Sequence, residues 1–105
     1  MEIKWHNKEI QKKMENMDEL VKIVGAEIAK MVKLRFNQIE ATDDFQELIR
    51  NGFGKPHPLK GDLKKYFGIG LTGNYRLVIL PEGKDKIIVR GVNDYHGDKY
   101  NWIIP

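Results

Sequence analysis

The hydrophobic pattern of this chain changes its period near residue 55. Between residues 18 and 39, apolar side chains recur at three- and four-residue steps, which is the spacing of one helical face. From residue 66 onward, large apolar residues alternate with small or polar ones, which is the pattern of strands. Because short connections favour antiparallel pairing of successive strands, we expect an α+β domain whose helices pack on an antiparallel β-sheet.

The first part of the chain is expected to hold a short strand and a helical hairpin. Glu2–Trp5 alternates polar and apolar residues, which fits a strand. Asn7 can cap a helix over residues 8–14, and a long amphipathic helix is expected over residues 18–39. Gly25 lies inside the long helix and weakens it by about 1 kcal/mol relative to alanine. These two helices are expected to be antiparallel and to cover the sheet.

A third, short helix and three strands are expected to follow. Thr42 is the expected N-cap of this helix, and Asn51-Gly52 is its expected end. The expected strands are Tyr66–Leu71, Tyr75–Leu80 and Lys86–Val92, with turns at 72–74 and 81–85 and with Asn93–His96 closing the last strand.

Composition excludes several classes of protein. A chain of 105 residues with 41% hydrophobic and 31% charged residues fits a single globular domain over residues 1–105. It has no cysteine, which removes disulfides, thiolate metal sites and cysteine nucleophiles. No apolar run is long enough to span a bilayer, and the first residues lack the apolar core of a signal peptide. We therefore expect a cytoplasmic protein with no membrane partner.

The positive charge belongs to the second half of the chain. Residues 1–54 carry nine Lys/Arg and ten Asp/Glu, whereas residues 55–105 carry nine Lys/Arg and five Asp/Glu. The whole chain has a formal net charge of +3. This excess favours an anionic partner that docks on the second half, and nucleic acid is the first candidate.

Candidate catalytic residues lie in three segments of that basic half. His57 and Lys60 lie in a loop that contains two prolines, Arg76 lies in a strand, and a second histidine ends the segment 94–96. If Leu77 faces the helices, Arg76 faces the open side of the sheet. Histidine transfers protons near neutral pH, and Arg and Lys stabilise a phosphate as its charge rises. These are the groups that metal-free RNA cleavage by a 2′-OH needs. We expect the sheet to bring the segments of His57 and His96 together into one basic site.

Each of these residues also has a structural interpretation. His57 can be a loop histidine bonded to backbone, and His96 can be simply solvated. Asp94 can cap a turn, and Tyr95 can be a half-buried strand residue. His57, His96 and Asp94 are adequate metal ligands, but no pair has a ligand spacing such as HxxxH. We therefore expect no metal and no other cofactor.

Taken together and in order, the segments HPLKGD (57–62), YFGIGL (66–71), GNYRLV (73–78) and DYH (94–96) resemble the RelE/ParE toxin superfamily. The HigB-like, or "plasmid maintenance killer", branch is the most similar. The resemblance covers roughly residues 1–97 and is strongest from 55 to 96. It implies a RelE-like microbial RNase toxin fold and a toxin of a type II toxin–antitoxin system.

The resemblance also implies an activity and partners. Such a toxin enters the ribosomal A site and cuts mRNA as an endoribonuclease. Its cognate antitoxin is a helix-turn-helix, HigA-like protein that neutralises it. Operator DNA is bound only through the complex with this antitoxin. Two alternatives on the same fold stay open: a ParE-like inhibitor of DNA gyrase, and a catalytically inactive corepressor that binds the antitoxin.

The resemblance maps six residues onto active-site positions: His57, Lys60, Arg76, Asp94, Tyr95 and His96. We assign their roles from their chemistry. Arg76 and Lys60 would stabilise the phosphorane, and His96 and His57 would share acid and base work. Tyr95 would stack on a base or assist proton transfer, and Asp94 would orient a neighbouring cation. Additional RNA-binding residues are expected to be Lys55, Lys64 and Lys65.

The chain departs from this branch in continuing past His96. Residues 97–105 form a short apolar extension that contains Trp102, Ile103 and Ile104. These side chains are too apolar to be left in water without a reason. We expect the extension to fold back on the core; pairing with an antitoxin or with a second copy is the alternative.

Overall fold

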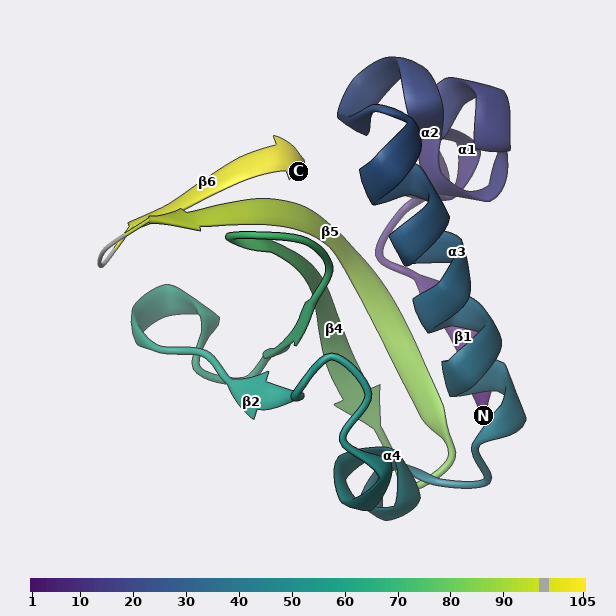
Figure 1. Ribbon diagram of the computed structural model, residues 1–105. Helices are drawn as coiled ribbons and strands as arrows, with labels where there is room; N and C mark the ends of the chain where they lie inside the picture. The colour runs from purple at the N-terminus through teal and green to yellow at the C-terminus, as the bar shows by residue number, and fades with distance from the viewer. Residues whose placement is uncertain (97–98) are drawn as a thin grey trace.

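The computed structural model describes residues 1–96 and 99–105. In these ranges a strand is followed by four helices and then by five strands (Figure 1). The elements are β1 (Glu2–Trp5), α1 (Lys8–Glu15), α2 (Met17–Val24), α3 (Ala26–Ala41), α4 (Phe45–Asn51), β2 (His57–Pro58), β3 (Phe67–Gly70), β4 (Tyr75–Glu82), β5 (Lys86–His96) and β6 (Lys99–Ile104), with a 3₁₀ turn at Gly61–Leu63. No helix within these ranges is long and apolar enough to cross a bilayer.

Strand β5 is the centre of the sheet. The strand order is β1-β5-β4-β3-β2, and β6 also pairs with β5. Strand β4 pairs along one edge of β5. The other edge is shared by β1, opposite Lys86–Val89, and β6, opposite Val92–His96. The first strand is present as expected, but it runs parallel to β5. The sheet is therefore mixed rather than purely antiparallel.

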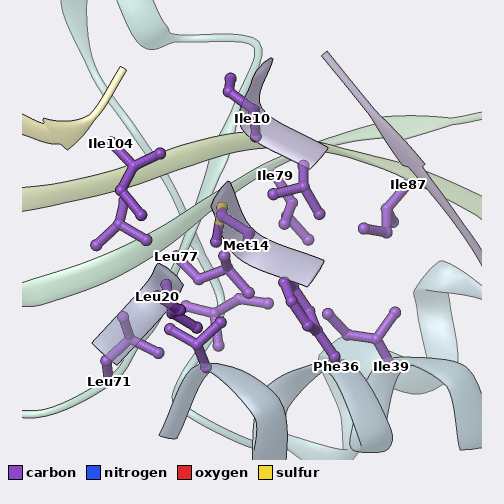
Figure 2. Close-up of a cluster of buried hydrophobic side chains, with 14 of the residues drawn as sticks. Ile10, Met14, Leu20, Phe36, Ile39, Leu71, Leu77, Ile79, Ile87 and Ile104 are labelled. Carbon is purple, nitrogen blue, oxygen red and sulfur yellow. The ribbon is translucent and has the colours of Figure 1, made fainter. Parts of the chain in front are cut away.

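Helices α1, α2 and α3 pack on one face of this sheet (Figure 1). Figure 2 shows the resulting core, in which side chains from these helices meet side chains from β4, β5 and β6. The labelled residues of this core are Ile10, Met14, Leu20, Phe36, Ile39, Leu71, Leu77, Ile79, Ile87 and Ile104. The apolar faces that the helical and strand periods of the sequence define are thus buried against each other in a single layer.

The expectation of one long helix over residues 18–39 is wrong. Gly25 has a φ of +87° and separates α2 from α3. Glycine adopts this backbone conformation without a steric cost, whereas other residues avoid it. The apolar steps continue across the break, so the periodicity alone could not reveal it. Asn16 begins α2 by accepting a hydrogen bond from the backbone N–H of Glu19.

The expected cap of the short third helix is also wrong. Asp44, not Thr42, is the N-cap of α4, and its Oδ1 accepts from the backbone N–H of Glu47 at 2.8 Å. Thr42 instead ends α3, where its hydroxyl donates to the carbonyl oxygen of Gln38 at 2.7 Å. Thr42 is buried, so its hydroxyl needs that partner. The end of α4 at Gly52, with a φ of +70°, is as expected.

The strands differ from expectation at their ends. Strand β3 is shorter than 66–71, β4 extends through Glu82 into the expected turn, and His57 belongs to the two-residue strand β2 rather than to a loop. The C-terminal extension folds back, as expected, by pairing with β5 and burying Ile104. Residues 97–98 of that extension lie outside the described residues.

Candidate active site

The strand register defines a row of side chains on the face of the sheet that the helices do not cover. Gly70, Arg76, Asn93 and Trp102 are successive cross-strand partners on β3, β4, β5 and β6. Because side chains alternate along a strand, Arg76 points away from the face that carries the buried Leu77. Arg76 therefore lies on the face away from α1, α2 and α3, as the alternation predicts, although Asn93 in the same row is buried.

His57 and Arg76 both lie next to Gly68. His57 is the cross-strand partner of Gly68, and a Cβ at residue 68 would lie 3.7 Å from both the Cβ of Arg76 and the Cε1 of His57. His57, Arg76, Lys55 and Arg35 line one pocket of about 490 Å³. A side chain that can carry a proton thus shares a pocket with three cations, which is a suitable site for a phosphate.

Backbone contacts orient the groups of this pocket. The carbonyl oxygen of Lys55 can only accept, so Nδ1 of His57 is the donor in their 3.1 Å hydrogen bond. This leaves Nε2 as the basic nitrogen of His57. Lys55 itself has a φ of +50°, a strained conformation for a residue with a side chain. Arg35 donates from Nε to the carbonyl oxygen of Gly70 at 2.9 Å, and burial lowers the pKa of its guanidinium.

His96 is held from both sides of its ring. Nδ1 lies 2.9 Å from Oδ1 of Asp94, and Nε2 lies 3.2 Å from Nδ2 of Asn74. The amide nitrogen of Asn74 can only donate, so Nε2 accepts and the proton of the neutral ring is on Nδ1. Asp94 therefore fixes the tautomer and the orientation of this imidazole, as a carboxylate does in many acid–base sites.

The two histidines do not share a pocket. The cross-strand partner of Asp94 is Tyr75, the neighbour of Arg76, so Asp94 and His96 leave the sheet from the face opposite to Arg76. The turn that joins β3 to β4 links the two groups. Arg76 donates from Nη1 to the carbonyl oxygen of Gly73 at 2.9 Å. Asn74, the residue after Gly73, donates to Nε2 of His96.

A second pocket, of about 500 Å³, contains Lys60 and Tyr95. Strand β6 completes it with Tyr100 and Trp102. The hydroxyl of Tyr100 accepts a hydrogen bond from the backbone N–H of Lys60 at 3.1 Å, and its ring centroid lies 4.9 Å from that of Tyr95. Lys60 and Tyr95 are thus brought together, but in a different pocket from the one that holds His57 and Arg76.

The remaining expected RNA-binding lysines are more peripheral. Lys64 and Lys65 follow the 3₁₀ turn and are exposed, and neither lines the two pockets described above. In the described part of the chain, no group of three or more His, Asp or Glu side chains is arranged to hold a metal ion.

Sequence reasoning missed three residues of these sites. Asn74 was interpreted only as a turn residue, although its position two residues before Arg76 placed it near the candidate site. Arg35 lies on α3, and nothing in the helical pattern distinguishes it from other surface cations. Tyr100 belongs to the extension, whose direction of return could not be deduced from its composition.

Comparisons with known proteins support the fold. No protein-family model and no curated protein matches this sequence. The structure is similar to the solved structure of a YoeB/ParE toxin from Agrobacterium tumefaciens, with a TM-score of 0.57 and 20% sequence identity. The match covers 91% of this chain and 100% of that chain. At this identity the similarity concerns the fold, and the chain therefore has the mixed α+β fold of a RelE/ParE-type toxin.

Proposed function

We propose that this protein is the toxin of a type II toxin–antitoxin pair and that it belongs to the HigB-like branch of the RelE/ParE superfamily. Its activity is ribosome-dependent endonucleolytic cleavage of mRNA. The observation that carries this proposal is the position of His57 and Arg76 on either side of Gly68, in one pocket with Lys55. The similarity to the fold of a known toxin supports it.

The chemistry uses these side chains and the 2′-OH of an mRNA that the ribosome presents. A base removes the proton of a 2′-OH, the oxygen attacks the adjacent phosphorus, and the 5′-oxygen leaves with a proton from an acid. His57, through its Nε2, is the proton-transfer group in the pocket of Arg76, and His96, oriented by Asp94, is the second, which reaches the RNA from the other side of the turn between β3 and β4. Arg76 and Lys60 stabilise the negative charge of the phosphorane, and Tyr95 contacts the RNA beside it.

The proposed partners follow from this activity. The toxin acts on mRNA in the ribosome in the cytoplasm and is neutralised by a cognate helix-turn-helix antitoxin of the HigA type. Operator DNA is contacted only through the toxin–antitoxin complex. The positive charge of the second half of the chain favours binding to RNA, and Lys64 and Lys65 extend this charge along the approach to Lys60.

Histidine substitutions test the proposal. Purified protein is incubated with a defined mRNA in the presence and absence of ribosomes, and the 5′ ends of the fragments are mapped. We expect cleavage inside codons only with ribosomes, and we expect the variants His57→Ala, His96→Ala and Arg76→Ala each to lose at least about tenfold in rate. The matched control is His6→Ala, because His6 is the third histidine and is exposed just after β1, at a distance from both pockets.

Two results would overturn the proposal. Full activity of all three variants would show that cleavage does not occur at this site. Intact mRNA together with trapped, cleaved gyrase–DNA complexes would favour the second candidate, a gyrase inhibitor. That candidate is kept because the name of the structural neighbour includes ParE. The two proton-transfer groups of this chain have no part in blocking gyrase, which is why the nuclease is preferred.

A further inference from the structure

Strand β6 places two aromatic residues on the open face of the sheet. The pairing of β5 with β6 skips Ile103, so Ile104 lies opposite Val92 and Trp102 lies opposite Asn93. This bulge turns Ile104 into the core while Trp102 and Tyr100 face away from the helices. A strand needed only to cover the core would not require aromatic side chains on its other face.

These aromatic side chains form one wall of the 500 Å³ pocket. The rings of Tyr95 and Tyr100 lie with their centroids 4.9 Å apart and are tilted by 32°, and the guanidinium of Arg90 lies 4.6 Å from the ring centre of Trp102. Arg90 occupies one face of the indole. The pocket is also lined by Lys60 and by the 3₁₀ turn Gly61–Leu63, which contains Asp62.

We propose that this pocket binds an unpaired nucleobase of the RNA, by stacking on Tyr100 and Trp102. Its position beside the cleaved phosphate rests on the function proposed above. The volume is within the range of small-ligand sites, and base stacking on aromatic side chains is the usual way in which proteins bind single-stranded RNA. Lys60 at the rim attracts the phosphate of the same nucleotide, and Asp62 can accept a hydrogen bond from an amino group on the base edge.

Paired bases cannot enter this pocket, because their faces are already stacked in the helix. The site therefore selects single-stranded RNA and directs one base of the substrate to β6 while its phosphate faces Arg76 and Lys60. The cross-strand row that runs from Arg76 through Asn93 to Trp102 links the two positions. Strand β6 thus acts as a specificity element, separate from the proton-transfer groups.

Tryptophan fluorescence tests this binding directly. The chain has two tryptophans, and Trp5 packs edge-to-face on Phe36, next to the helices. In a Trp5→Phe background, emission reports on Trp102 alone. The probe is a 2′-O-methyl RNA of roughly ten nucleotides, which spans one single-strand binding site and lacks the attacking hydroxyl. We expect saturable quenching of Trp102, because a base that stacks on the indole quenches its emission.

Three further variants identify the interaction. Tyr100→Leu should weaken RNA binding by about tenfold, the effect of losing one base–aromatic stack. Tyr100→Phe should bind like the parent, because the ring remains and only the hydrogen bond to Lys60 is lost. Phe53→Leu is the control, since Phe53 is an exposed aromatic residue outside the pocket. Equal weakening by Tyr100→Phe and Tyr100→Leu would overturn the proposal.

The outcomes separate this inference from the nuclease itself. If the wild-type protein cleaves mRNA on ribosomes, Tyr100→Leu cleaves with an unchanged kcat/KM, and RNA leaves Trp102 emission unaltered, the base site is wrong and the nuclease stands. If RNA quenches Trp102 but the wild-type protein leaves mRNA intact, the base site stands and the nuclease is wrong.

Discussion

Gly91 on β5 lies directly beneath the carbonyl oxygen of Ile104 on β6. A Cβ on residue 91 would lie 2.0 Å from that oxygen, and the φ of Gly91 is +154°. Only a residue without a side chain lets the two strands approach each other here. The attachment of β6 therefore depends on this glycine.

We predict that Gly91→Ala detaches or displaces β6. The expected loss of stability is about 2–3 kcal/mol, because backbone cannot move aside as a flexible side chain can. Gly83→Ala is the control: Gly83 also has a positive φ, +62°, but a Cβ there would contact nothing. Urea denaturation of both variants measures the difference. If both variants lose the same free energy of unfolding, the loss arises mainly from backbone strain at positive φ and not from the contact with Ile104.

Asn74 is expected to act as a positioning residue for His96. Removing its amide in Asn74→Ala frees Nε2 of His96 and should lower the rate of cleavage by about tenfold, as for other residues that orient a catalytic group. Stability should change little, because Asn74 is exposed. Thr72→Ala, in the same turn, is the control for effects of the turn itself. A shift in the pH profile of kcat for Asn74→Ala, absent in Thr72→Ala, would distinguish positioning from a general structural role.

Arg76 should not be replaceable by lysine. One guanidinium nitrogen is used for the carbonyl oxygens of Gly73 and Tyr75, and the rest of the fork is available for a phosphate. Lysine has a single nitrogen for both tasks, so we expect Arg76→Lys to lose at least about tenfold in kcat/KM while binding RNA almost normally. Arg50→Lys, at an exposed position on α4, should be neutral. Full activity of Arg76→Lys would mean that a point charge is sufficient.

Asn93 is completely buried, and neither polar atom of its side chain has a hydrogen-bond partner among the described residues. Leucine has nearly the same shape and no unsatisfied group. Asn93→Leu should therefore raise the free energy of unfolding by about 1 kcal/mol. Asn101→Leu, at an exposed site on β6, should change it by less than about 0.5 kcal/mol. Destabilisation by Asn93→Leu would mean that the amide has a partner in solution.

The ion pair between Lys4 and Glu82 gives a small pH dependence. Nζ of Lys4 lies 2.9 Å from Oε1 of Glu82, and this contact lowers the pKa of Glu82 and raises the pKa of Lys4. A lowered carboxyl pKa contributes stability above the ordinary value of that group, and the contribution is lost as the pH falls through the folded-state value. Glu82→Gln should thus be slightly less stable than the wild type at pH 7 and equally stable in acid.

A double-mutant cycle isolates this pair. Lys4→Met, Glu82→Gln and the double variant are compared by urea denaturation at neutral and acidic pH. Because both side chains are more than 40% exposed, the coupling should be small and should decrease as salt is added. A coupling that persists in acid would have to arise from packing rather than charge.

Patterns of spacing predicted most of the fold, because spacing determines which face of each element is buried. They failed where one residue changes the backbone without changing the pattern. Gly25 breaks a helix although the apolar steps continue, and Asp44 rather than Thr42 caps α4 because burial gives the Thr42 hydroxyl another partner. The parallel direction of β1 depends on its pairing with β5, more than 80 residues later in the chain, and the alternation of four residues does not reveal that direction.

The candidate site was predicted in part for the same reason. Alternation along β4 placed Arg76 on the open face, but the proximity of His57 depends on the pairing of β2 with Gly68, which sequence spacing does not reveal. The segment 94–96 was expected to join that pocket. Its side chains alternate between faces, so Tyr95 meets Lys60 while His96 meets Asn74. In the structure, His57 shares the pocket of Arg76, whereas His96 does not.

The shared edge of β5 has a consequence for how this chain folds. Glu2 pairs with Lys86, although most of the sequence lies between them. Strand β6 pairs with the remaining part of the same edge of β5. Contacts between distant parts of a chain form late, because the entropy of closing the loop is lost before the contacts stabilise anything. The β3–β4–β5 meander can form from local contacts first, so we expect a transient state in which one edge of β5 is open. An open edge can pair with a strand of another chain. The rate at which β1 and β6 pair with this edge therefore determines how much of the chain folds and how much aggregates.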